Sequence, residues 1–429
     1  MNSRERLAMT LNHEQPDKVV VDLGSCLASG IAASALNRLR NALGLKKELV
    51  KIHEPFQMLG EIEEDVRQAL GVDVVGISTD STMFGFENKD WKPWKLFDGT
   101  DVLVAGGFDP VPDEKGNLYL YPGGDKSAKP CAMMPKGGFY FDMLVRQQPL
   151  DENTMDARED YKDDDHLFTD EELKLLQKKA DFYYNNTEYG IIGGNFLCGL
   201  GDFAILPGPT IKEPKGIRNL EEWLVAHYIY PDYIKDRYAM QTETALENLC
   251  MYKEAVGDKI QAIQISGTDF GTQKGEFISP DMYREFYMPY FKKLNDWVHS
   301  NTTWKTMYHT CGSIINFMDD FAETGMDILN PVQCSAAGMD AKTLKEKYGK
   351  KFVFWGGGID TQKTLPFGSV QDVEREVTER LDIFSKDGGF VFNAVHNIQS
   401  NSPTENMVAM FRTVQEYNGA DKAPGREVE

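Results

Sequence analysis

Short apolar runs rich in β-branched residues alternate with amphipathic segments along most of this chain, and this alternation limits the possible folds more than any other feature. Such runs predict strands buried on both faces, as in a parallel sheet. Strands that alternate with helices predict βαβ units. The predicted strands are residues 19–23, 72–78, 190–196, 261–266, 305–309, 327–331, 352–356 and 390–395. Eight of them favour an α/β fold of the closed (β/α)8 TIM-barrel type over an open doubly wound sheet.

Capping residues mark the starts of three helices between these strands. Ser279, followed by a proline, predicts an N-cap with proline at the first helical position. The segment after it keeps one apolar face, and we expect a single helix through residue 297. Thr169 with Glu172 three residues later is a capping-box pattern, and Ser369 opens a third helix.

The alternation is interrupted between about residues 84 and 189, where proline, glycine and aromatic residues are frequent. We expect a single barrel domain spanning 1–429, with 84–189 as an insertion over the carboxyl-terminal rim. The insertion should contain one or two hairpins, a solvated acidic loop at 160–165 and the helix after Thr169. Its aromatic residues either wall an apolar pocket or form a small core of their own. They are Phe84, Phe86, Trp91, Trp94, Phe139, Tyr140 and Phe141.

Charge and composition exclude several classes of partner. The formal net charge of −21 disfavours nucleic acid and anionic membranes. No apolar run reaches the roughly 18 residues of a membrane helix, and the first residues hold no apolar signal core, so we expect a cytoplasmic protein. The six cysteines are scattered, which favours metal binding or burial over disulfides.

The strongest local motif is His309-Thr310-Cys311-Gly312, at the end of a predicted strand. In an extended segment, alternate side chains point to the same side, so His309 and Cys311 can converge on one point. An imidazole and a thiolate together suit zinc. The alternative is a buried cysteine beside a hydrogen-bonded histidine.

Further candidate ligands follow later strands. Cys334 comes after the strand at 327–331, and His396 comes after the strand at 390–395. In a parallel barrel these strand ends meet on one face, where barrel active sites lie. The sequence therefore allows His309, Cys311, Cys334 and His396 to form a metal site together.

Two aspartates and a glycine run also follow predicted strands. Asp80 and Asp269 suit a general acid or base, or a substrate anchor, and the alternative for each is a cap of the next turn. Gly357 and Gly358 could let the backbone approach a cofactor, although the run lacks the GxGxxG spacing and also suits a tight turn.

Taken together, these motifs resemble the uroporphyrinogen decarboxylase superfamily, in its branch of corrinoid-linked methyltransferases. The resemblance runs nearly from end to end and implies the same (β/α)8 barrel. Within it, Gly357, Gly358 and Asn397 are the candidate cofactor contacts. The segments that carry it are 2–6, 71–73, 278–280, 309–312, 327–333, 354–362 and 392–399.

The superfamily contains decarboxylases and methyltransferases. Decarboxylases carry an arginine just after the first strand to grip substrate carboxylates, whereas here no arginine occurs between the first predicted strand and Arg38. The His309-x-Cys311-Gly312 pattern is similar to the zinc site of the methyltransferases. Their third ligand is a cysteine at the end of the last strand, where this chain has His396, so the resemblance leaves Cys334 and His396 both open as the third ligand.

The resemblance implies a zinc-dependent methyltransferase that moves a methyl group between a methylated substrate and the cobalamin of a separate corrinoid protein. The aromatic insertion favours a methoxylated aromatic donor and O-demethylation. Asp269, Asp80 and His396 are the candidate catalytic residues. The expected partners are the corrinoid protein and a small-molecule methyl donor, with a homodimer as the candidate assembly. The alternatives are a decarboxylase and a non-catalytic barrel that binds a corrinoid or an aromatic ligand.

Overall fold

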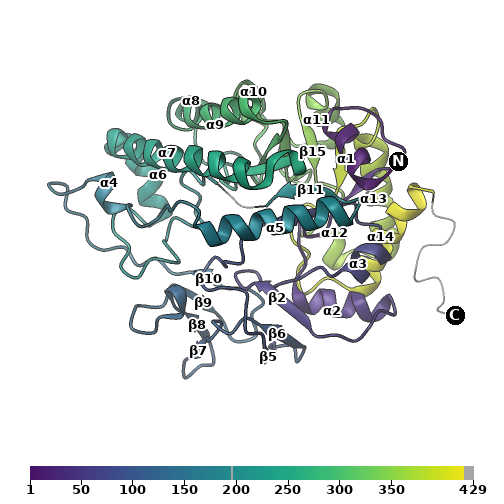
Figure 1. Ribbon diagram of the computed structural model, residues 1–429, viewed down its shortest axis with the longest axis horizontal. Coiled ribbons are helices and arrows are strands. Elements are labelled where there is room, and N and C mark those ends of the chain that lie inside the picture. The colour runs from purple at the N-terminus through teal and green to yellow at the C-terminus, as the bar shows by residue number, and fades with distance from the viewer. Residues whose placement is uncertain (195–196, 420–429) are drawn as a thin grey trace.

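Eight parallel strands form a nearly closed barrel in the computed structural model, which describes residues 1–194 and 197–419 (Figure 1). Each lies in a run predicted from the sequence, although the end of the 190–196 run is outside the described residues. The (β/α)8 barrel is therefore confirmed. The order around the barrel is β1 (Val20–Val21), β16 (Phe390–Phe392), β15 (Val353–Trp355), β14 (Ile328–Asn330), β13 (Lys305–His309), β12 (Ala262–Ser266), β11 (Gly190–Gly193) and β4 (Val74–Ile77).

The first and last strands of this order approach each other and nearly close the barrel. The backbone N–H of Asp73, just before β4, donates to the carbonyl of Val21 at 2.8 Å. Farther along β4, a Cβ atom on Gly76 would lie 1.7 Å from the carbonyl oxygen of Ser25. Only glycine lets the two segments come this close.

The amino-terminal end of the barrel is covered by helix α1 (Ser3–Leu11). Leu7 and Leu11 are buried with the inward-facing residues of the strands. The carbonyl of Arg4 accepts a hydrogen bond from the side chain of Gln261 at 2.9 Å, just before β12. The opposite end, where the strands finish at their carboxyl ends, holds the candidate site.

Helices pack around the barrel between the strands. The N-caps predicted at Thr169, Ser279 and Ser369 are confirmed, since each side chain accepts a backbone N–H of the first turn. The helices are α2 (Ala33–Ala42), α3 (Glu64–Leu70), α4 (Ala157–Asp160), α5 (Asp170–Asn186), α6 (Leu220–Ile229), α7 (Pro231–Val256), α8 (Pro280–Phe286), α9 (Met288–Asn301), α10 (Met318–Glu323), α11 (Ala341–Tyr348), α12 (Thr364–Phe367), α13 (Val370–Phe384) and α14 (Thr404–Tyr417).

The single helix expected after Ser279 is instead two helices, α8 and α9, which meet at Tyr287. Pro289 stands near the start of α9. A proline has no N–H for the carbonyl four residues back, so a continuous helix would lose a hydrogen bond there. The apolar face continues across the break, which is why the periodicity alone missed it.

Two small sheets lie beside the barrel, at the bottom of Figure 1. One is β10 (Asp142–Met143), β9 (Ala132–Met134), β8 (Leu118–Leu120) and β7 (Val111–Pro112), as hairpins were expected. The other is β3 (Leu59–Gly60), β2 (Val50–Glu54), β6 (Asp101–Val104) and β5 (Lys92–Lys95). Strands β2 and β3 were not predicted from the sequence. Both precede the expected insertion, and β2 pairs with β6 of that region.

Four of the seven expected aromatic residues, together with Phe108, form a small core, whereas Trp91 lines the larger cavity at the barrel mouth. Phe84, Phe86, Phe108, Phe141 and Trp94 pack mainly edge to face, with ring centroids 5.4–6.5 Å apart. The aromatic cluster therefore holds the insertion together more than it lines a pocket. Of the described helices, none combines the length and apolar character needed to cross a membrane.

Candidate metal centre at the barrel mouth

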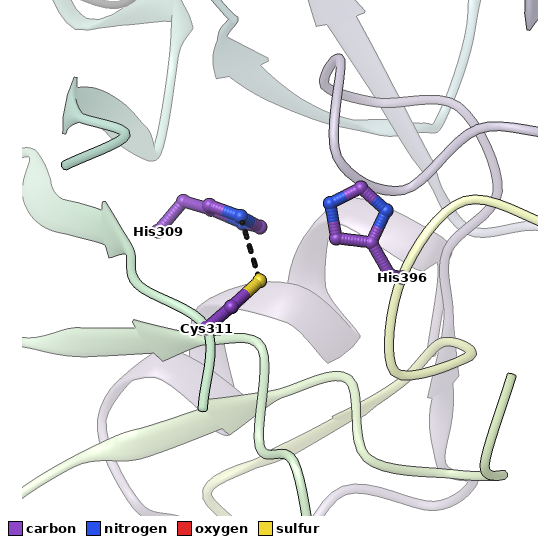
Figure 2. Close-up of side chains that lie close together, drawn as sticks. All are labelled: His309, Cys311 and His396. Carbon is purple, nitrogen blue, oxygen red and sulfur yellow. Dashed lines mark hydrogen bonds between the residues drawn. The ribbon is translucent and has the colours of Figure 1, made fainter. Parts of the chain in front are cut away.

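His309, Cys311 and His396 meet at the carboxyl-terminal end of the barrel, where their potential ligand atoms all lie within 4.8 Å of one another (Figure 2). His309 is the last residue of β13, Cys311 lies two residues beyond it, and His396 lies in the loop after β16. The Cys311 sulfur is 3.3 Å from Nε2 of His309. The convergence of His309 and Cys311 thus extends to a third side chain from a distant part of the sequence.

The imidazole of His309 is held by a neighbouring strand. Its Nδ1 lies 2.7 Å from Oδ1 of Asn330, the last residue of β14. The Asn330 amide nitrogen donates to the carbonyl of Trp355 at 3.0 Å, which leaves its oxygen to accept from His309. In this arrangement Nδ1 carries the hydrogen and Nε2 has a free lone pair, as in a metal-binding histidine with an outer partner.

The loop after β13 is fixed from two sides. Asp269 accepts the backbone N–H of Cys311 at 2.5 Å, and Gln333 accepts that of Gly312 at 2.8 Å. Gly312 has a φ of +88°, and a Cβ atom there would lie 2.4 Å from the backbone of Gly271. Only glycine fits this position, so the turn after Cys311 has little freedom to move.

The electrostatic setting of the three residues favours a cation. Burial, followed by the carboxylate of Asp269, raises the pKa of the Cys311 thiol well above its ordinary value. Burial also raises the pKa of Asp269, whose Oδ1 lies 3.8 Å from Nε2 of His309. Burial lowers the pKa of His396 to about 3, which keeps this ring neutral. A divalent ion would favour the Cys311 thiolate and relieve these penalties.

The two histidines are not equally prepared to bind a metal. The backbone N–H of Asn397 donates to Nδ1 of His396 at 2.8 Å. A neutral ring that accepts at Nδ1 carries its hydrogen on Nε2. Binding a metal through Nε2 requires that hydrogen to move and the contact with Asn397 to break. His309 can bind zinc without a change of tautomer and Cys311 needs only to lose its thiol proton, whereas His396 fits after a local change.

The structure does not bring Cys334 into this group. Cys334 lies four residues beyond the end of β14, and burial raises the pKa of its thiol to about 12. After burial, the charges of Arg380 and Glu376 have the largest effects on this pKa. Both residues belong to α13, which packs on the outside of the barrel.

The other predicted site residues have partners within the protein. Asp80 pairs with Lys179 at 2.7 Å. A Cβ atom on Gly357 would lie 2.7 Å from the carbonyl oxygen of Val332, and one on Gly358 would lie 2.4 Å from the ring of Phe392. Close packing against the chain itself therefore accounts for both glycines. The amide of Asn397 binds the carbonyl of Leu27 and the backbone N–H of Gly30, so it anchors the loop after β1.

Two cavities open at the barrel mouth. The smaller, of about 300 Å³, is lined by Cys311, Gln333, Asp360 and His396. The larger, of about 660 Å³, is lined by the loops after β1, β4 and β11 together with β2 and the 160–165 segment. Asp80 lies on its wall, and Asp202 on the same wall is close enough to raise the pKa of Cys311.

The 160–165 segment was expected to be a solvated acidic loop, and for two of its aspartates this is wrong. Asp164 pairs with the buried Arg218, and Asp165 pairs with the buried Arg237, on the wall of the larger cavity. No sequence pattern indicated these pairs, because the arginines lie more than fifty residues farther along the chain.

Comparison with known proteins agrees with this fold. Residues 211–417 match the family model described as uroporphyrinogen decarboxylase (URO-D). The match covers less than half of the chain but includes His309, Cys311 and His396. The match supports the resemblance to the uroporphyrinogen decarboxylase superfamily. A solved structure, a methyltransferase from Methanosarcina mazei, is similar over 97% of this chain and 99% of its own, with a TM-score of 0.53 and 16% identity. Curated proteins gave no match.

Three residues that shape the mouth were not predicted from the sequence. Asn330 lies in a segment that carries the resemblance, and strand alternation places it on the same side as Ile328, which faces inward. Its contact with His309 could have been proposed from the barrel order. Asp202 and Glu54 had no usable signal, because one lies in an irregular loop and the other on the unexpected strand β2.

Proposed function

We propose that this protein is a zinc-dependent methyltransferase that moves a methyl group between a methylated substrate and the cobalamin of a separate corrinoid protein. The observation that carries the proposal is the grouping of His309, Cys311 and His396 at the barrel mouth. One thiolate and two imidazoles form a ligand set suited to zinc that leaves a fourth position for substrate. A methoxylated aromatic compound is the donor that we favour.

The comparisons support the reaction class without identifying the substrate. The Methanosarcina mazei structure is described as a methyltransferase, and at 16% identity the likeness extends to the fold alone. The chain contains no Asp-x-His-x-x-Gly motif of the kind that ligates cobalt in corrinoid domains. We therefore propose that the corrinoid arrives on a partner and docks at the barrel mouth.

Each residue around the centre has a defined task in this proposal. Zinc bound there supplies a Lewis acid for the oxygen or sulfur atom that bears the methyl group. Asn330 orients His309, and Asp269 holds the Cys311 loop through the backbone N–H. Asp269, whose carboxyl lies beside His309, is the residue that we assign to protonate the leaving group.

Zinc content is the first test. We expect close to one zinc per chain in protein purified without chelator, and loss of this zinc in both His309→Ala and Cys311→Ala. Cys334→Ala is the matched control, because it removes a cysteine outside the group, and it should keep the metal. A folded parent protein without zinc, or loss of zinc only in Cys334→Ala, would contradict the proposal.

Methyl transfer is the second test. A reduced corrinoid protein is incubated with the zinc-loaded enzyme and a panel of methoxyarenes and simple methyl donors, and methylation of cobalt is followed by absorbance. Turnover with a methoxyarene that disappears in Cys311→Ala is the expected result. No turnover with any donor on the panel would reject this function.

A decarboxylase is the second candidate, because the matched family model carries that description. A polycarboxylate substrate needs free cationic side chains. Each lysine and arginine on the wall of the larger cavity is instead paired with an acidic residue. This pairing favours the methyltransferase, and release of CO₂ from a tetrapyrrole by zinc-free protein would favour the decarboxylase.

A further inference from the structure

The larger cavity contains two buried carboxyl groups that no cation balances. Glu54, on β2, is 4% exposed, and Asp202, in the loop after β11, is 8% exposed. Glu54 accepts only backbone N–H groups, from Phe56 and Met83, each at 3.0 Å. Asp202 accepts the N–H of Ala204 at 2.9 Å. Neither has a cationic partner among residues 1–194 and 197–419.

The cations of the same cavity are already neutralised. Every lysine and arginine that the structure places on its wall is paired with a carboxylate. The pairs are Lys51–Glu61, Arg67–Glu64, Lys179–Asp80, Arg218–Asp164 and Arg237–Asp165. Burial lowers the pKa of His53, which keeps that ring neutral, and His166 lies 3.9 Å from the carboxylate of Glu172. An anionic group entering the cavity would find no free positive charge.

The two carboxyl groups suit an uncharged ligand. Burial raises the pKa of Glu54 to about 7, and burial with the nearby charge of Asp269 raises that of Asp202 to about 7. A protonated carboxyl both donates and accepts, so it can bind a hydroxyl or an ether oxygen. Ser25 adds a buried hydroxyl on the same wall.

The cavity is also close to the metal group. Asn397, next to His396, holds the loop of Leu27 and Gly30 that forms one wall. On another wall, the hydroxyl of Thr268, next to Asp269, donates to the carbonyl of Leu200 at 3.2 Å, in the loop after β11 that carries Asp202. A volume of about 660 Å³ accepts an aromatic ring with several substituents.

We propose that the larger cavity binds the methyl donor and selects an uncharged, hydroxyl-bearing methoxyarene over an anionic one, through hydrogen bonds to Glu54 and Asp202. This inference rests on the proposed function, since it names the donor of the same reaction. It adds a substrate class that excludes methoxybenzoates.

Three matched probes test the charge preference: 3-methoxybenzyl alcohol, 3-methoxybenzoate and 3-methoxybenzylamine, with binding to the zinc-loaded protein measured by calorimetry. We expect the alcohol to bind at least tenfold more tightly than the benzoate and more tightly than the amine. Equal or tighter binding of the benzoate, tighter binding of the amine, or binding of none of the three would overturn the proposal.

A pair of variants ties the preference to this cavity. Glu61→Gln removes the partner of Lys51 on the cavity wall and should strengthen benzoate binding. Glu48→Gln removes the partner of Lys46, a lysine that is 82% exposed and outside the cavity, and should leave the ratio of alcohol to benzoate binding unchanged. An identical response of both variants would overturn the assignment.

Binding and turnover separate this inference from the proposed function. If the alcohol binds selectively but no methoxyarene is demethylated, the proposed function fails while the cavity assignment stands. If a methoxybenzoate is demethylated efficiently, the proposed function stands and the charge preference fails.

Discussion

The two sides of the barrel mouth are built by different rules. On the side of β13, β14 and β16, short strands and a fixed turn bring His309, Cys311 and His396 together, and each contact depends on the regular geometry of the barrel. On the side of β1, β4 and β11, irregular loops and the insertion enclose a larger cavity with a dense set of ion pairs. The first side is suited to reaction chemistry, and the second is suited to recognition.

This difference explains why the first side was the more predictable. Strand ends are visible in the sequence, and parallel strands place their carboxyl ends on one face, so the sequence could group His309, Cys311 and His396, although it also included Cys334. The pairing of Asp164 with Arg218 joins two loops without periodicity. No local sequence pattern predicts such a contact.

The largest effect that should separate the two sides comes from their aspartates. Asp269→Asn removes the carboxyl next to Cys311, and we expect methyl transfer to fall by about 10²-fold or more, as for loss of a general acid. Asp80→Asn, on the wall of the larger cavity, should have a much smaller effect on kcat, because Asp80 is paired with Lys179. Steady-state kinetics of both variants with one donor measure the two losses. A larger loss of kcat in Asp80→Asn than in Asp269→Asn would contradict this prediction.

A smaller effect should come from the support of His309. Asn330→Leu keeps the branched shape but removes the acceptor of the Nδ1 hydrogen, and zinc affinity should fall by about 10–100-fold. Asn330→Asp keeps an acceptor and serves as the control. Competition with a chelator measures both, and a thermal melt checks that each variant is folded. Equal zinc affinity in parent and Asn330→Leu would show that His309 needs no outer partner.

The third expected effect concerns stability rather than reaction rate or zinc affinity, and it lies on the cavity side. Glu54 has a raised pKa in the folded protein, so between about pH 4.5 and 7 the folded state binds more protons than the unfolded state. Stability from the neutral carboxyl is therefore greatest at low pH and is lost as the pH rises through about 7. The loss amounts to about 3 kcal/mol for one such group.

Glu54→Gln should make this decline shallower by the share that Glu54 contributes, because the amide does not titrate, whereas Asp202, whose pKa is also raised to about 7, keeps its own share. Urea denaturation of parent and variant at several pH values between about 5 and 8 measures the difference. Parallel pH profiles for the two proteins would show that Glu54 does not titrate as described.

The fold itself followed from the sequence in most respects. All eight barrel strands were expected, because buried parallel strands are apolar on both faces and stand out from their surroundings. Strands β2 and β3 contain no continuous apolar run of the kind that marks the barrel strands, since Val50–Glu54 alternates apolar and polar residues, as in a strand buried on one face. The break at Tyr287 was missed because the apolar residues keep their helical spacing across it, although Pro289 interrupts the backbone hydrogen bonds.

Within the site, the sequence left the third ligand open between Cys334 and His396. Both follow a barrel strand, and the sequence does not say how the chain turns afterwards. After β14 it turns so that Cys334 lies near α13, whereas after β16 it brings His396 back toward His309, with ring centroids 5.2 Å apart. Turn direction depends on tertiary packing, which the motif does not encode.

Helix α1, which covers the amino-terminal end of the barrel, has a kinetic consequence for the proposed reaction. Donor and corrinoid protein must both use the opposite end, so whichever docks across it blocks the route of the other. A large partner seated there would trap a small donor inside and would have to leave before the product escapes. Such a geometry imposes an order of addition, with the small molecule first in and last out.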